Sequence, residues 1–275
     1  MADSAKKILF VNSEMFPYLP EGHISNLCRE LPQAIQERKN EIRAFMPRYG
    51  CINERKNQLH EVIRLSGMNI IISDVDRPLV IKVASVSAAR IQVYFIDNED
   101  YFRRKAVYHD DHGKFFPDNG ERAIFFARGV LETVKKLRWA PDIIHCSGWI
   151  SHVLPLYLSK AYREDPIFTG AKVVLSLFED TPTESFAPGL DKAILFGGVK
   201  PKDVALLTEA PSGIELAKLA AQYSDGIILG SPDVNPELVS HVGTLGVPVL
   251  EYQKEMYTSD AYADKYNAFY DQILK

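Results

Sequence analysis

Residues 7–31 read KILFVNSEMFPYLPEGHISNLCREL, and the fold expected for the chain rests on this stretch. The apolar run at 8–11 predicts a buried strand, and the loop after it is broken by two prolines. Apolar side chains then recur at helical spacing over residues 24–35, which predicts a helix. A strand, a loop and a helix form the first half of a βα unit, in which ligands bind where the strand ends. The question of a ligand site therefore concerns residues 13–25.

Length and composition limit the function classes. The chain has 275 residues, of which 46% are hydrophobic, and this is enough for a packed core. A formal net charge of −4 gives no electrostatic basis for binding nucleic acid or an anionic membrane. Three well-separated cysteines without a CxxC pair predict reduced thiols in a cytoplasmic protein. No apolar run approaches the roughly 20 residues of a spanning helix, and the N-terminus lacks the apolar segment of a signal peptide.

Strands and helices are expected to alternate along most of the chain. Strands are predicted at 41–46, 142–146, 172–176 and 226–230, and helices at 120–137, 150–162, 214–223 and 233–243. This alternation predicts an α/β fold with a doubly wound, mostly parallel sheet. Residues 59–96 differ, because short β-rich runs divided by turn residues such as Asp76-Arg77-Pro78 predict hairpins. Residues 97–119 are expected to be a polar loop and residues 177–211 to be loop-rich. Residues 257–274 are expected to form an amphipathic helix with a core-packing stripe.

A series of short motifs recurs in one order along the chain. They are KILFVNSEMFPY at 7–18, ELPQAI at 30–35, MPRYG at 46–50, VYFIDNEDYF at 93–102, the D-N-x-x-R signal of Asp118, Asn119 and Arg122, PDIIHCSGW at 141–149 and PLYL at 155–158. Taken together, over roughly residues 6–240, the chain resembles the N-terminal half of bacterial glycogen and starch synthases. These enzymes are the retaining transferases of glycosyltransferase family 5.

The resemblance implies a two-lobed GT-B architecture with Rossmann-like halves. Residues 1–275 would form a single domain, the N-terminal lobe, and the helix at 257–274 would pack back on it as a closing helix. The implied reaction is transfer of glucose from ADP-glucose to the non-reducing end of an α-1,4-glucan, with no cofactor and no metal. A nucleotide sugar or an α-glucan is therefore the expected ligand.

The chain departs from the family pattern around the expected cleft. The family's K-T-G-G-L loop corresponds to LPEGH at 19–23, where Glu21 would repel the diphosphate that a lysine and bare backbone N–H groups attract. The family's H-D-W-H reads SGWI at 147–150, and its T-V-H-N reads SLFE at 176–179. The chain also ends about where the family's donor-binding lobe should begin.

Three functional hypotheses follow from these departures, and whether the chain is an enzyme stays open. Glucosyl transfer is expected to be impaired, or to depend on a protein partner that supplies a second lobe. The alternatives are a non-catalytic domain that binds glucan or regulates glycogen metabolism, and a scaffold that docks on a complete enzyme.

Five residues are candidates for contact with substrate, and each has a structural alternative: Glu14, Gly22, Asp118, Asn119 and Trp149. Glu14 would line the site or orient its loop, and Gly22 would contact ligand or provide a turn with positive φ. Asp118 and Asn119 would bind a sugar or cap a helix. Trp149 would stack on a sugar or, in the preferred interpretation, cover the sheet.

Other polar residues are interpreted as structural. His109-Asp110-Asp111-His112 is interpreted as a solvated loop rather than a metal site, because adjacent loop residues rarely converge on one ion. His23 is interpreted as a surface or capping-region histidine. Glu179-Asp180 with Glu184 is disfavoured as a glycosidase acid pair, since the sequence does not define their separation. No catalytic residue is predicted.

Overall fold

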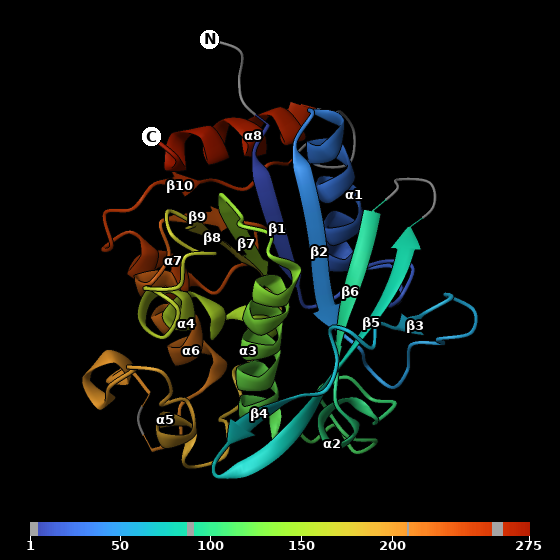
Figure 1. Ribbon diagram of the computed structural model, residues 1–275. Helices are drawn as coiled ribbons and strands as arrows, with labels where there is room; N and C mark the ends of the chain where they lie inside the picture. The colour runs from blue at the N-terminus through green and yellow to red at the C-terminus, as the bar shows by residue number, and fades with distance from the viewer. Residues whose placement is uncertain (1–4, 87–90, 208, 255–260) are drawn as a thin grey trace.

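The computed structural model describes residues 5–86, 91–207, 209–254 and 261–275 (Figure 1). The strands in this part of the chain are β1 (Lys7–Asn12), β2 (Glu41–Pro47), β3 (His60–Glu61), β4 (Met68–Ile72), β5 (Val75–Val86), β6 (Ile91–Asp97), β7 (Ile143–Ser147), β8 (Lys172–Leu177), β9 (Gly226–Leu229) and β10 (Val249–Leu250). They form one sheet in the order β10-β9-β8-β7-β1-β2-β6-β5-β3, with β4 paired to β5.

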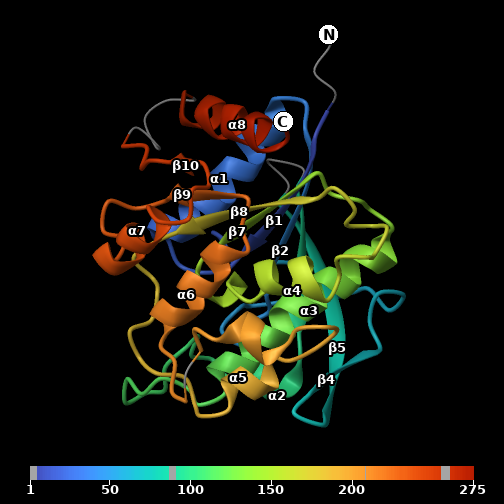
Figure 2. The ribbon, with the colours of Figure 1, turned by 90° about the vertical axis from the view of Figure 1, so that its left-hand side faces the viewer.

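Helices cover both faces of this sheet. They are α1 (His23–Glu37), α2 (Glu99–Phe102), α3 (Asn119–Leu137), α4 (Leu154–Lys160), α5 (Leu190–Ala193), α6 (Gly213–Gln222), α7 (Pro236–Val242) and α8 (Ala261–Ile273), with short 3₁₀ turns at Trp149–Ser151 and Pro201–Val204. Helices α3, α4 and α6 pack together on one face, and α1 and α8 pack together on the other (Figures 1 and 2). No described helix is both long enough and apolar enough to cross a membrane.

The sheet is parallel from β10 to β6 and antiparallel beyond β6. Every residue of β7 and β9 is buried, as expected for parallel strands with helices on both faces. The predicted α/β fold with a doubly wound, mostly parallel sheet is therefore confirmed. The chain moves from β1 to β2 in one direction and later returns to β7 on the other side of β1, so the strand order reverses at β1. The carboxyl ends of strands at such a reversal form the usual ligand crevice of this fold class.

Two predictions about the irregular regions were wrong. Asp76-Arg77-Pro78 lie inside β5, and the turn that joins β4 to β5 is Ser73-Asp74. Both turn residues have positive φ, 49° and 62°, as a tight two-residue hairpin requires, and aspartate tolerates this region better than most residues. The expected loop at 97–119 contains α2, because the Asn98 side chain accepts two backbone N–H bonds and caps that helix. Residues 177–211, predicted to be loop-rich, contain only short helical segments such as α5 among the described residues.

Helix α8 packs on the amino-terminal end of the sheet. Its buried stripe consists of Tyr262, Ala263, Tyr266, Phe269, Tyr270 and Ile273. The Tyr270 hydroxyl lies 2.7 Å from Nδ1 of the buried His145 on β7, and the Lys6 ammonium lies 2.6 Å from Oδ1 of Asp271. The beginning of the predicted helix, residues 257–260, lies outside the described residues. The assignment of residues 1–275 to one lobe stays a prediction.

Candidate functional site

Three loops meet at the carboxyl ends of β1, β7 and β8. Asn12 pairs with Ser147, and Ser147 pairs with Ser176, so the three strands end side by side. The Ser13 N–H donates to the Ser147 carbonyl at 2.8 Å and continues the parallel pairing by one residue. The residues just after these strand ends include Glu14, Gly148 and Glu179. We call this region the carboxyl-edge site.

Gly148 lets the three loops approach one another closely. Its φ is +85°, and a Cβ added there would lie 2.0 Å from Oγ of Ser13 and 3.1 Å from Oδ2 of Asp180. The next residue, Trp149, donates its backbone N–H to the same Asp180 oxygen at 3.0 Å. A side chain at position 148 would therefore separate the β1 loop from the β8 loop.

Carboxylates dominate the electrostatics of the carboxyl-edge site. Burial raises the pKa of Glu14, although its carboxylate accepts the backbone N–H of Ser25. Burial, together with the nearby charges of Glu14 and Glu179, raises the pKa of Asp180 to about 7. Burial also acts to raise the pKa of Glu179, but hydrogen bonds from Ser231 and His23 hold it below its usual value. His23 Nδ1 lies 3.3 Å from Glu179 Oε1.

Several buried polar atoms of residues at these strand ends have no hydrogen-bond partner among the described residues. They are Nδ2 and Oδ1 of Asn12, Oγ of Ser13 and Oδ1 of Asp180. The side chains of Asn12 and Ser13 are only 1% exposed, so bulk water does not reach them freely. Unsatisfied polar atoms in a native structure are uncommon and cost free energy. Within the carboxyl-edge site, the carboxylates of Glu14 and Glu179 are the accessible acceptors for hydroxyl groups.

Comparison with known proteins assigns the family. A family model described as the starch synthase catalytic domain matches residues 7–249. The chain belongs to this family. The resemblance predicted from the motifs is thus confirmed at the level of the family.

Relatives of this family member include curated glycogen synthases. That of Chlorobium limicola is 35% identical over 227 residues, which cover 82% of this chain and 45% of the relative. That of Pelodictyon phaeoclathratiforme is 29% identical over 277 residues, covering 98% of this chain and 55% of the relative. The chain therefore spans about half the length of these curated relatives.

A solved structure supports the fold assignment. The catalytic domain of starch synthase IV from Arabidopsis thaliana, bound to ADP and acarbose, matches with a TM-score of 0.73. The match covers 90% of this chain and 51% of that chain, at 16% sequence identity. At this identity the likeness shows the fold alone, that of a starch synthase GT-B catalytic domain.

Two of the predicted site residues lie at the carboxyl-edge site. Glu14 follows β1 directly and contributes to the cluster of carboxylates described above. Gly22 is the N-cap residue of α1, and a Cβ added there would lie 4.0 Å from Oε1 of Glu14. Its φ is −166°, which is extended backbone, so the alternative of a turn glycine with positive φ is wrong. A contact between either residue and a ligand stays a prediction.

Asp118 and Asn119 bind other parts of the chain. Asp118 occupies the N-cap position of α3, but its side chain makes no capping bond and instead accepts Nη2 of Arg104 at 2.5 Å. The buried Asn119 donates to the Tyr108 carbonyl at 2.9 Å and accepts Nη1 of Arg122 at 2.5 Å. The capping alternative is therefore wrong for both side chains. Sugar binding by these residues stays a prediction.

Trp149 lies behind the carboxyl-edge site in an aromatic cluster. Its ring is 1% exposed and packs against Tyr108, Phe115 and Phe186, with ring centroids 4.7–5.9 Å apart. Both faces are therefore largely covered by this chain. Stacking of Trp149 on a sugar stays a prediction.

Sequence reasoning missed several residues that build the site. Asn12 was not considered, Ser13 was not singled out within the loop at 13–25, and Asp180 was considered only in a disfavoured acid pair. Each closely follows or ends a predicted strand, which was the available signal. Tyr49 was missed as well: its buried hydroxyl donates to the Ser13 carbonyl at 3.0 Å and lies 2.7 Å from that of Tyr108. The hydrogen bond from Tyr49 thus holds the backbone of the loop after β1 in place.

Two histidines that were interpreted as structural, His109 and His23, each lie close to a glutamate. His109 Nε2 lies 2.9 Å from Glu184 Oε1, which joins the loop before α3 to the loop after β8. Among the described residues no group of three or more His, Cys, Asp or Glu side chains could hold a metal ion. His23 is the first residue of α1 and reaches Glu179 across the site.

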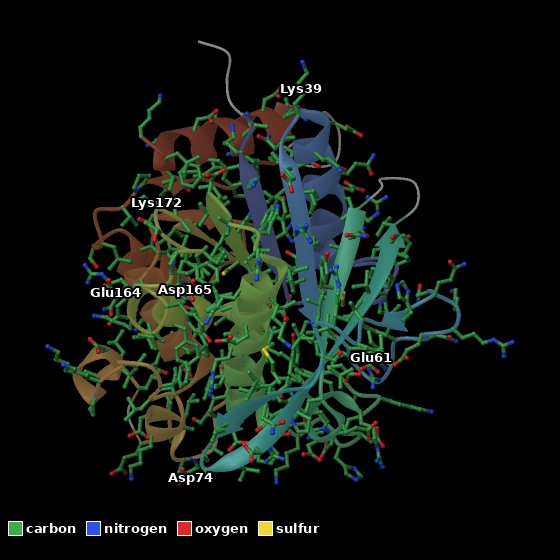
Figure 3. The ribbon with its side chains drawn as sticks, in the orientation of Figure 1. Lys39, Glu61, Asp74, Glu164, Asp165 and Lys172 are labelled. Atoms are coloured by element: carbon green, nitrogen blue, oxygen red, sulfur yellow. The ribbon has the colours of Figure 1, made fainter. Side chains whose placement is uncertain are left out.

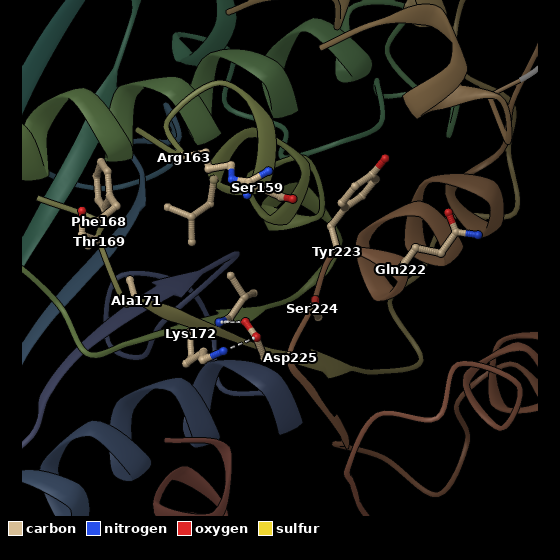
Figure 4. Close-up of a pocket in the computed structure, with 13 residues that line it drawn as sticks. Ser159, Arg163, Phe168, Thr169, Ala171, Lys172, Gln222, Tyr223, Ser224 and Asp225 are labelled. Atoms are coloured by element: carbon tan, nitrogen blue, oxygen red, sulfur yellow. Dashed lines mark hydrogen bonds and ion pairs between the residues drawn. The ribbon is translucent and has the colours of Figure 1, made fainter. Parts of the chain in front are cut away.

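A separate hollow lies at the opposite edge of the sheet, where β8 begins (Figure 4). It measures about 500 Å³ and is lined by polar residues that include Arg163, Lys172 and Asp225. Lys172 Nζ lies 3.0 Å from Oδ1 of Asp225, and the Val173 N–H donates to the other oxygen at 2.8 Å. The lysine charge in this hollow is therefore already compensated.

Proposed function

We propose that the carboxyl-edge site binds a neutral α-glucan and holds a nucleotide diphosphate poorly. The observation that carries this proposal is the convergence of the Glu14, Glu179 and Asp180 carboxylates where β1 and β8 end. The family supports a glucan as ligand, since the relatives are glycogen synthases.

Electrostatics disfavours the diphosphate. Two like charges 4 Å apart repel each other by about 1 kcal/mol in water and by about 4 kcal/mol at an effective dielectric constant of 20. The loop at 19–23 contributes the exposed Glu21 and no lysine or arginine. Backbone N–H groups alone would have to offset the repulsion from these carboxylates. A diphosphate is therefore expected to bind weakly.

Sugar hydroxyls match the same surroundings better. Hydroxyl groups can donate to the carboxylates of Glu14, which is half-buried, and Glu179, which is exposed. Hydrogen bonds to charged groups contribute about 1.5–3 kcal/mol each. A glucan unit thus gains contacts that a diphosphate does not.

Glucosyl transfer by this chain alone is expected to be slow. Transfer from ADP-glucose requires stabilisation of the charge that develops on the departing diphosphate. The loop at 19–23 offers no cation for that task. Synthase activity that depends on a protein partner stays within the proposal, as does a regulatory role for a glucan-binding lobe.

The test is a calorimetric titration of the chain with maltohexaose. We expect a dissociation constant in the millimolar range, equivalent to about −4 kcal/mol, and about tenfold weaker binding for Glu14→Gln. The matched control is Glu61→Gln, which changes an exposed glutamate on β3 (Figure 3). Absence of saturable binding, or equal loss in both variants, would overturn the proposal.

A reciprocal variant tests the electrostatic argument. Glu21→Lys replaces the exposed carboxylate of the loop at 19–23 with a cation. We expect it to tighten binding of ADP-glucose while maltohexaose binding stays within about twofold, because the glucan is neutral. Unchanged ADP-glucose binding would show that the charge of this loop does not control donor binding.

A further inference from the structure

A second hollow lies between the β4–β5 turn and α5, on elements separate from the carboxyl-edge site. It measures about 610 Å³, and the residues that line it include Ser73, Asp74, Arg128, Gly189, Lys192 and Phe196. Figure 1 shows the β4–β5 hairpin reaching beneath α3 towards α5, and Figure 3 labels Asp74 at the hairpin tip. The volume falls in the range typical of small-molecule sites.

Arg128 is a buried residue whose side chain lines this hollow. Its side chain extends from α3 and is 7% exposed. Nη1 donates to the Ile71 carbonyl on β4, and the guanidinium carbon lies 3.6 Å from the centre of the Phe196 ring. Nε is buried and has no hydrogen-bond partner. The guanidinium is thus held rigidly between the hairpin and the α5 segment.

No carboxylate in the described part of the chain forms an ion pair with Arg128. An indirect connection to a carboxylate runs through the Tyr162 hydroxyl, which interacts with Arg128 and donates to Glu132 at 2.7 Å. Glu132 is itself 3.5 Å from the Lys135 ammonium. A buried charge is costly unless it is paired, so an anion bound beside Arg128 would be stabilising.

Lys192 adds a second cation to the same hollow. It is exposed on α5, and no described carboxylate lies within ion-pair distance of it. Asp74 is the one carboxylate among the lining residues, so the lining carries net positive charge. In the hollow of Figure 4, by contrast, the lysine has a carboxylate partner, because Lys172 is paired with Asp225.

We propose that this hollow, which we call the Arg128 pocket, binds the phosphate group of a small phosphorylated metabolite. A planar guanidinium and a lysine ammonium are the side chains best suited to a phosphate. The Ser73 hydroxyl can donate to a third phosphate oxygen, and Asp74 can accept hydroxyls of an attached sugar. A neutral glucan would leave the charge of Arg128 uncompensated. The proposal does not depend on the function of the carboxyl-edge site.

The test is calorimetry of the full chain with inorganic phosphate, glucose 1-phosphate and glucose. We expect saturable binding of both phosphate compounds and none of glucose at the same concentrations. Lys192→Ala should weaken phosphate binding by about tenfold, the loss typical of one charge-assisted contact. Lys202→Ala, which removes an exposed lysine outside the pocket, should leave it unchanged.

Arg128→Gln provides a second variant. We expect it to abolish phosphate binding while circular dichroism shows a folded chain. Should this variant fail to fold, Lys192→Ala still decides the matter, since Lys192 is on the surface. The proposal is overturned by absence of wild-type binding at roughly 10 mM phosphate, or by equal binding in wild type and Lys192→Ala.

Discussion

Replacing Asp180 by asparagine removes a carboxyl group whose pKa burial raises to about 7. The substitution keeps the size of the side chain and an oxygen that can accept the Trp149 N–H, a bond of 3.0 Å in the native chain. The new amide N–H₂ can donate towards Glu14, whose charge acts on Asp180. The variant therefore changes the charge of the site with little change in its shape.

The magnitude follows from proton linkage. The ordinary pKa of the side chain is 3.8, so between there and about 7 the folded chain keeps a proton that the unfolded chain has released. The free energy of unfolding of the wild type then falls as pH rises, by about 1.4 kcal/mol per pH unit. Over the whole window the loss is about 4 kcal/mol. Below the window both states are protonated and the cost vanishes.

Urea denaturation at pH 4, 6 and 8 measures this difference. Asp180→Asn should match the wild type at pH 4 and exceed its free energy of unfolding by up to about 4 kcal/mol at pH 8. Asp111→Asn, on an exposed loop, is the control. Its free energy of unfolding should differ from that of the wild type by the same amount at all three pH values. A difference for Asp180→Asn that is equally flat, or that grows towards low pH, would refute the assigned protonation of the site.

Two further substitutions test how the chain is held together at the two edges of the sheet. Gly148→Ala should lower the free energy of unfolding by about 3 kcal/mol, because the new Cβ would lie 2.0 Å from Oγ of Ser13. Gly170→Ala should lower it by only about 1 kcal/mol, because position 170 has a φ of +84° but open space around it. Equal costs in urea denaturation would contradict a close approach at Gly148. Tyr270→Phe should cost about 1–3 kcal/mol in the same assay, because it leaves a buried nitrogen of His145 unpaired. An unchanged midpoint would show that this hydroxyl does not anchor α8.

The sequence predicted the regular part of the fold because its patterns are local. The apolar run after Lys7 and the helical spacing after Ile24 each lie within one element, and β1 and α1 form there. The turn expected at Asp76-Arg77-Pro78 failed because these residue types pair within a long hairpin once β4 lies beside them. Turn-forming residues describe a local preference, and the pairing of neighbouring strands overrode it.

The candidate site was predicted only in part, since its residues are distant in the sequence. Glu14 was recognised because it ends the first strand, whereas its partner Asp180 lies more than 160 positions later. They meet because β1, β7 and β8 are neighbours, and no local pattern encodes that order. Burial, which sets the protonation of Asp180, likewise depends on the packed structure.

The central claim is that the carboxyl-edge site prefers a neutral glucan to a nucleotide sugar. The most direct measurement is calorimetric titration of the wild-type chain with maltohexaose and with ADP-glucose under identical conditions. The account predicts saturable binding of maltohexaose and at least about tenfold weaker binding of ADP-glucose. Tighter binding of ADP-glucose than of maltohexaose would contradict it.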